Sequence, residues 1–183
     1  RAYPDKLRHI AQPPYAIFCK GAMPDARKSV GIVGARMCSE YGRSIATKLG
    51  KLLADKDVQV ISGMALGIDS ASHAGALQGK GSTFAVLGCG CDVCYPKNAR
   101  NLYENIQSSG GGILSEYPPG TEPMPYRFPE RNRIISALSD CLVVVEAKKK
   151  SGSLITADAA LEQGKDVYAV PGRFGDALSE GCN

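Results

Sequence analysis

Residues 29–40 read SVGIVGARMCSE, and this stretch decides the fold. Its first half is a short apolar run that is typical of a buried strand, and its second half is a small loop that carries Gly34 and Arg36. Ser39 follows as a candidate N-cap for a helical pattern over residues 40–55. A strand that passes through a small loop directly into a helix is the building unit of a parallel α/β sheet.

The same succession of strand, loop and helix continues along the chain. Predicted strands cover residues 29–34, 58–62, 83–87, 112–116, 141–146 and 166–171, and predicted helices cover residues 40–55, 67–78, 98–107, 129–138 and 154–163. The strands are almost continuously apolar, which indicates coverage on both faces. We therefore predict an α/β fold: an extended Rossmann-like, doubly wound, mostly parallel sheet with helices on both faces. The Ala-rich composition of residues 67–78 predicts a closely packed helix.

The first 28 residues do not fit this alternation. They contain Pro4, the pair Pro13-Pro14 and Pro24, with one short extended run at residues 16–20. We interpret residues 1–28 as a lead-in segment with a candidate edge strand, and residues 29–183 as the Rossmann-like domain. The chain begins with Arg1 and stops in a loop-like stretch at Asn183, so we expect a fragment of a longer protein.

Length and composition set mild limits. A chain of 183 residues is long enough for one domain with its own core, and no apolar run approaches the ~20 residues of a membrane span. The net charge of +4 is a weak indication of an anionic partner. Seven cysteines, several of them in apolar strand patterns, favour reduced thiols and a cytoplasmic protein over a disulfide framework.

Small, hydroxyl-bearing or arginine-bearing residues follow the predicted strands. In a parallel sheet, all loops that follow strands emerge at the same edge, and helix N-termini there offer N–H groups to anions. The sequence therefore predicts a phosphate-binding edge. The candidate residues are Gly34, Arg36, Ser62, Gly63, Arg131, Asn132, Arg133, Ser151, Gly152 and Ser153. Arg131 and Arg133 diverge on a helix, so we expect one to reach the ligand and the other to form an ion pair with Glu130 or Glu116.

Several other kinds of site are not supported. The loop after the first strand reads G-x-x-G-x-R, which is not the G-x-G-x-x-G of a dinucleotide site, and no P-loop motif occurs. The two histidines, His9 and His73, suggest no hydrolytic triad. Asp69 lies just inside a predicted helix, where capping or interaction with the helix dipole explains it about as well as a catalytic role would. We expect no cofactor.

Three cysteines, Cys89, Cys91 and Cys94, form a C-x-C-x-x-C pattern that resembles a metal site. No histidine lies nearby, and the fourth candidate, Cys38, follows the first strand, which the second strand should separate from the third. We therefore interpret the cysteines as small residues at a tight turn and expect no functional metal.

The motifs, taken in order, resemble the DNA-processing protein A family, also called Smf. They are IVGAR at residues 32–36, SGMALGID at 62–69, LG at 87–88, YP at 95–96, SEYPPG at 115–120, FPERNRII at 128–135, SGSLIT at 151–156, AALEQG at 159–164, and VPG at 170–172. The resemblance runs from about Tyr3 to the last residue. One departure is Ala35, where family members often carry Ser.

The resemblance implies an extended Rossmann domain that binds single-stranded DNA. It implies a protein that protects incoming strands in natural transformation, helps load the RecA recombinase on them and acts as a homodimer, with no catalytic reaction. Phe128 or Tyr126 is then a candidate for stacking on a base. The alternative is an enzyme similar to the phosphoribohydrolases that act on nucleoside monophosphates. Its P-G-G-x-G-T loop is absent, and Glu116 is the best candidate acid or base.

Overall fold

The computed structural model describes residues 3–183, which contain one seven-stranded sheet. Its strands are β1 (Phe18–Gly21), β2 (Ser29–Val33), β3 (Gln59–Ser62), β4 (Thr83–Val86), β5 (Gly112–Ser115), β6 (Cys141–Val144) and β7 (Asp166–Ala169). They lie in the order β1-β5-β4-β3-β2-β6-β7, and only β1 with β5 is antiparallel. Because the chain builds outward from β2 first in one direction and then in the other, the predicted doubly wound fold is confirmed.

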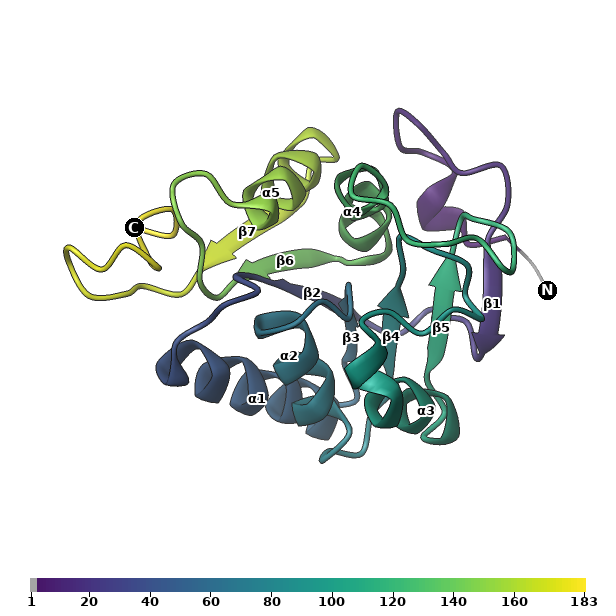
Figure 1. Cartoon of the computed structure of the whole chain (residues 1–183), viewed down its shortest axis with the longest axis horizontal. Coiled ribbons are helices and arrows are strands. Elements are labelled where there is room, and N and C mark those ends of the chain that lie inside the picture. Colours follow the sequence, from purple (N-terminus) through teal and green to yellow (C-terminus); the bar gives the residue numbers. More distant parts are fainter. Residues whose placement is uncertain (1–2) are drawn as a thin grey trace.

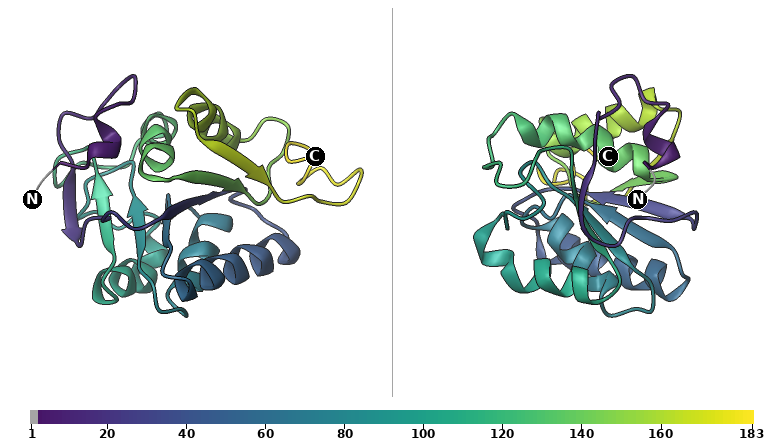
Figure 2. Two further views of the ribbon diagram at one scale, coloured as in Figure 1. Left: turned by 180° about the vertical axis from the view of Figure 1, so that it is seen from behind. Right: turned by 90° about the vertical axis from the view of Figure 1, so that its right-hand side faces the viewer.

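Helices cover both faces of the sheet, as Figures 1 and 2 show. On one face lie α1 (Glu40–Asp55), α2 (Ile68–Ala76) and α3 (Arg100–Ser108), and on the other lie α4 (Arg127–Leu138) and α5 (Gly152–Glu162). Two short 3-10 helices, η1 (Asp5–Leu7) and η2 (Lys97–Ala99), complete the set. Each face has its own core: Ile134 and Leu142 belong to one cluster, and Ile32 and Ile68 belong to another.

Helices α1 and α2 pack unusually closely because glycine lines their contact. A Cβ atom on Gly50 would lie 2.2 Å from the Ser72 carbonyl oxygen, and one on Gly75 would lie 2.0 Å from the Thr47 carbonyl oxygen. The compact packing predicted for residues 67–78 is therefore realised between helices as well as against the sheet.

Two helices begin two residues earlier than the sequence pattern predicts. Helix α5 begins at Gly152, because the Ser151 hydroxyl accepts a hydrogen bond from the Ser153 N–H at 3.4 Å and so caps the helix there. Helix α4 begins at Arg127, and Pro129 fits its first turn, where N–H groups have no partner within the helix. Gly152 and Ser153 are thus helical residues and not part of a loop.

The lead-in segment lies along one edge of the sheet. Strand β1 pairs antiparallel with β5, with Phe18 opposite Ser115, and Leu7 is buried in the core beside α4. Residues 1 and 2 of the predicted lead-in lie outside the described residues. Within residues 3–183, none of the helices has the length and apolar character needed to cross a membrane.

Candidate nucleic-acid interface

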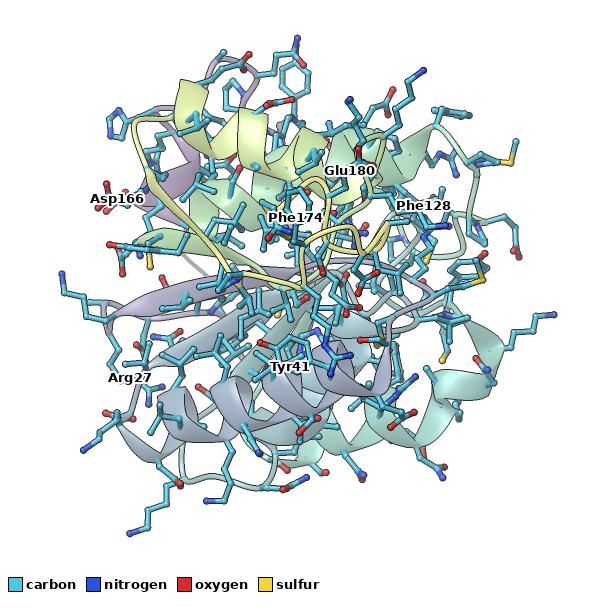
Figure 3. All side chains as sticks on the ribbon, turned by 90° about the vertical axis from the view of Figure 1, so that its left-hand side faces the viewer. Arg27, Tyr41, Phe128, Asp166, Phe174 and Glu180 are labelled. Carbon is cyan, nitrogen blue, oxygen red and sulfur yellow. The ribbon has the colours of Figure 1, made fainter. Side chains whose placement is uncertain are left out.

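A cleft of about 380 Å³ opens at the carboxyl ends of β2 and β6. These two strands are the neighbours at which the sheet changes its building direction, where open α/β sheets bind ligands. The cleft contains eight of the predicted residues: Gly34, Arg36, Phe128, Arg131, Asn132, Ser151, Gly152 and Ser153. Figure 3 shows Phe128 between the two helical layers. The fold therefore brings most of the predicted phosphate-binding edge into one hollow.

Arg36 supplies an uncommitted positive charge to this cleft. Its side chain is exposed, and its guanidinium carbon lies 5.3 Å from the centre of the Phe128 ring. No carboxylate that the structure describes forms an ion pair with it. A planar guanidinium held over an aromatic face can donate two parallel hydrogen bonds to a phosphate.

A smaller, mainly apolar hollow of about 60 Å³ adjoins the cleft behind Arg36. Gly63, Leu87, Tyr95 and Phe128 are among the residues that line it. The rings of Tyr95 and Phe128 are stacked, with centroids 5.3 Å apart and planes inclined by 29°. An aromatic wall beside a cationic cleft is the combination that proteins use for single-stranded nucleic acids.

The N-terminus of α5 forms the wall of the cleft that carries Ser151, Gly152 and Ser153. The two serine hydroxyl oxygens lie 2.8 Å apart, and the Asn132 side-chain amide donates to the Gly152 carbonyl oxygen at 3.2 Å. Nothing lies within 4 Å of the position that a Gly152 Cβ would occupy. The first turn of α5 is therefore open, and it offers N–H and hydroxyl donors without side-chain bulk.

Arg131 and Asp69 form the charged floor of the cleft. Both are buried, at 4% and 6% exposure, and Arg131 donates to the carbonyl oxygens of Gly63 and Val86. Asp69 accepts from the Gly63 N–H at 3.2 Å. Burial raises the pKa of Asp69 to about 6 against the opposing effect of Arg131, and burial lowers the pKa of Arg131 to about 10. Arg131 thus joins α4 to the ends of β3 and β4 while its charge remains near the cleft.

Three predicted residues lie outside the main cleft. Ser62 is fully buried and donates its hydroxyl hydrogen to the Ile32 carbonyl oxygen at 2.6 Å, whereas Gly63 lines the smaller hollow. Arg133 points away and forms two hydrogen bonds of 2.7 Å with the Glu116 carboxylate. Of the two arginines expected to diverge, Arg131 is the one at the cleft. Glu116, the candidate acid or base of the alternative enzyme, is engaged by Arg133.

The N-terminus of α1 reaches the same edge of the sheet, but the chain occupies it with its own carboxylate. Ser39 caps the helix by accepting from the Gly42 N–H at 3.0 Å, as its sequence position predicts. The Glu146 carboxylate accepts from the Ser39 N–H at 2.9 Å and also from the Ser39 hydroxyl. This helix end is where a dinucleotide pyrophosphate sits in related folds. In this protein the Glu146 carboxylate takes the place of an external anion at the positive end of α1.

His73 and the cysteine turn do not line the main cleft, although Cys89 lines the smaller hollow beside it. His73 is fully buried, and its Nδ1 lies 2.7 Å from the Thr83 hydroxyl, which itself donates to the Val60 carbonyl oxygen. Burial lowers the pKa of His73 to about 3, so the ring is neutral. Burial also raises the pKa of the Cys89 thiol to about 11. No group of histidine, cysteine and acidic side chains in residues 3–183 is arranged to hold a metal ion.

Sequence reasoning missed several residues of the cleft. Lys148 and Lys150 line it, although a run of three lysines is more typical of a solvated loop, and Met37 and Asp69 line it as well. The position of the lysines directly after a strand was the available signal. The role of Glu146 had no signal of this kind, because its partner Ser39 lies 107 residues away in sequence.

Comparison with known proteins identifies the family. The family model for DNA recombination-mediator protein A matches residues 1–183. The chain belongs to this family. The fold, the cleft and the order of motifs can therefore be compared with solved members of the DNA recombination-mediator protein A family.

Two DNA processing proteins with solved structures are similar to this chain. DNA processing protein DprA from Streptococcus pneumoniae is 44% identical over 183 residues, which is 99% of this chain and 64% of that protein. Its X-ray structure matches with a TM-score of 0.90 at 43% identity over 98% of this chain and 63% of that one. DNA processing protein A from Helicobacter pylori, whose structure concerns a single-stranded DNA binding mode, matches with a TM-score of 0.86 at 30% identity over 99% of this chain and 82% of that one. The chain thus spans about two thirds of the length of the S. pneumoniae relative.

Proposed function

We propose that this chain binds single-stranded DNA, as the strand-binding part of a cytoplasmic DNA processing protein that acts in natural transformation. The observation that carries the proposal is the cleft of about 380 Å³. Both the Arg36 guanidinium, which forms no ion pair with any described residue, and the open N-terminus of α5 line it. The structural similarity to the H. pylori protein, whose structure concerns single-stranded DNA binding, supports the same assignment.

The chemistry of the cleft suits single strands better than duplex. Donors from Arg36, Ser151 and Gly152 match phosphate oxygens, and the stacked rings of Tyr95 and Phe128 form an aromatic wall for the flat face of a base that is free to leave its neighbours. Every base has such a face, so the binding should tolerate any sequence. The cleft needs no reaction to serve this purpose, and we propose a binding protein rather than an enzyme.

The wider role extends the proposal beyond this cleft. We propose that the full-length protein protects incoming strands, helps load the RecA recombinase on them and works as a homodimer. The family's description as a recombination mediator and the names of its relatives support this role.

Titration of the chain with fluorescent oligo-dT, followed by anisotropy, tests the binding proposal. If the chain neutralises about three phosphates, the logarithm of the binding constant should fall with the logarithm of the salt concentration at a slope near −2, because each neutralised phosphate of a single strand contributes ~0.7 to the slope. A duplex of the same length should bind more weakly. Equal affinity for duplex, or an affinity that salt does not change, would contradict the proposal.

A further inference from the structure

We propose that Glu146 is a positioning residue that holds the Arg36 loop, residues 34–38, in the conformation that binds the DNA strand. This inference rests on the proposed function. Glu146 does not line the cleft, and it is 1% exposed. It must therefore act through the loop and not by touching DNA.

Glu146 contacts the loop close to both ends. Its backbone carbonyl oxygen accepts from the Ala35 N–H at 2.7 Å, just before Arg36. Its carboxylate accepts from the Ser39 N–H at 2.9 Å and from the Ser39 hydroxyl, directly after the loop. Within the described chain, no backbone hydrogen bond reaches the N–H groups of residues 36–38 between these points. The Ile68 N–H also donates to the Ala35 carbonyl oxygen at 3.2 Å, so two residues hold the start of the loop. Glu146 is the one residue that contacts both the start of the loop and Ser39 at its end.

The surroundings of the carboxylate are shaped for this contact. A Cβ atom on Gly42 would lie 2.4 Å from the Glu146 carboxyl carbon, so only glycine lets the first turn of α1 pass so close. No cation among the described residues forms an ion pair with Glu146. Its charge is therefore compensated by Ser39 and the positive end of α1, which ties the carboxylate to this one geometry.

Two simpler roles make different predictions. If Glu146 only caps α1, its loss should lower stability and leave DNA affinity unchanged. If its charge only repels DNA, its removal should raise affinity. A positioning role predicts a loss of affinity that depends on Arg36, because the loop matters for binding through the guanidinium it carries.

A double-mutant cycle tests the proposal with oligo-dT anisotropy on the chain. Glu146→Ala should lower affinity about tenfold, the effect of about one lost charge-assisted hydrogen bond. Glu146→Gln keeps an acceptor for the Ser39 N–H and should bind within about threefold of the unmodified chain. In an Arg36→Ala background, Glu146→Ala should change affinity by less than about twofold, because the two residues act as one unit.

Asp140→Ala is the matched control. Asp140 accepts from the Ser29 N–H at 2.8 Å, so it holds the opposite end of the same strand, β2. Its loss should lower stability without changing DNA affinity. If Glu146→Ala does not fold, Ser39→Ala removes the hydroxyl contact with Glu146 and leaves the Ser39 N–H contact, so it should show a smaller loss of affinity with the same dependence on Arg36.

The outcomes separate this proposal from the proposed function. Equal losses from Glu146→Ala with and without Arg36, or a gain of affinity from either Glu146 variant, would overturn the positioning role. If Arg36→Ala alone leaves oligo-dT binding unchanged, the proposed function of the cleft fails first.

Discussion

Two helix N-termini meet the same edge of the sheet, and they differ in what already occupies them. At α1, the Glu146 carboxylate accepts from the Ser39 N–H at 2.9 Å, so the chain has filled this anion site itself. At α5, no carboxylate of the described residues accepts a hydrogen bond from the first turn, and Lys148 and Lys150 stand beside it. A helix end attracts an external anion only where the chain has not supplied one of its own.

A third N-terminus at this edge, that of α2, lies between the two cases. Asp69 in its first turn turns back to the Gly63 N–H and is buried beneath the cleft. Its pKa, raised by burial to about 6, makes this internal anion one that can be neutralised under mild conditions. At this edge of the sheet, the N-terminus of α1 is thus occupied by a carboxylate, that of α2 holds a carboxylate that can be protonated, and that of α5 is open. The open N-terminus of α5 lines the cleft together with Arg36.

The largest expected effect comes from the arginine that faces the open end. Arg36→Ala should weaken oligo-dT binding by ~1.5–3 kcal/mol, the range of a charge-assisted hydrogen bond. Lys149→Ala is the matched control, because Lys149 is exposed and does not line the cleft, so its charge is screened. Fluorescence anisotropy on both variants at one salt concentration makes the comparison. Similar losses for the two would contradict the assignment of the phosphate to this cleft.

The second effect comes from closing the open end in the manner of α1. Gly152→Asp adds a carboxylate to the first turn of α5, where the new Cβ has free space. Oligo-dT affinity should fall by ~1–2 kcal/mol, whereas the melting temperature should hold or rise, because an acidic residue favours a helix N-terminus. Glu40→Gln, which removes an exposed charge from the first turn of α1, should leave binding nearly unchanged. Thermal unfolding of Gly152→Asp accompanies the titration, because a destabilised protein would lose affinity for reasons other than the added carboxylate. A stable Gly152→Asp protein with unchanged affinity would contradict the role of the open helix end.

A third effect follows from the protonatable end. As pH falls through about 6, Asp69 becomes neutral in the folded chain, and binding of oligo-dT should strengthen by ~0.5–1 kcal/mol. Because the folded-state pKa is raised above its unfolded value, stabilisation from this proton is full below about pH 4 and is lost as pH rises through 6. Asp69→Asn should remove the Asp69 part of the pH dependence of binding. An unchanged pH profile in that variant would assign the effect to another group.

The smallest effect is expected at the cysteine turn. Replacing Cys89, Cys91 and Cys94 with Ala should leave oligo-dT affinity nearly unchanged, although Cys89 lines the smaller hollow, because no thiol is needed there as a donor or ligand. The replacement should cost about 1–2 kcal/mol of packing, mostly at the buried Cys89 and Cys91, since buried Cys behaves as a small hydrophobe. Elemental analysis of protein purified without chelator accompanies this test. About one zinc or iron per chain, with binding lost on its removal, would refute the expectation that the turn carries no functional metal.

The sequence predicts this fold well because its signals are local. Continuous apolar runs mark the parallel strands, and Ser39 caps α1 through a neighbour three residues away. Most of the cleft is predictable for a related reason: strand ends of a parallel sheet meet at one edge, whatever the details of packing. Gly34, Arg36 and Ser151 therefore come together as expected.

The destinations of long side chains are not predictable in this way. The divergence of Arg131 and Arg133, and Glu116 as one of two candidate partners, are predictable from helix spacing, but which arginine reaches the cleft depends on how α4 packs. Ser62 follows a strand as the pattern requires, but its hydroxyl is used by the Ile32 carbonyl oxygen. Glu146 appears only as the end of a predicted strand, and its partner at Ser39 depends on how β2 and β6 pair. These contacts are set by three-dimensional packing and have no local pattern.

The most direct test of the account follows the backbone amides of the two helix ends by NMR. Labelled chain is titrated with oligo-dT, and the amide resonances of Gly152 and Ser153 in α5 are compared with those of Glu40 and Tyr41 in α1. We expect large chemical-shift changes at the first turn of α5 and small ones at the first turn of α1, where Glu146 already fills the anion site. Shifts at α1 that equal or exceed those at α5 would contradict it.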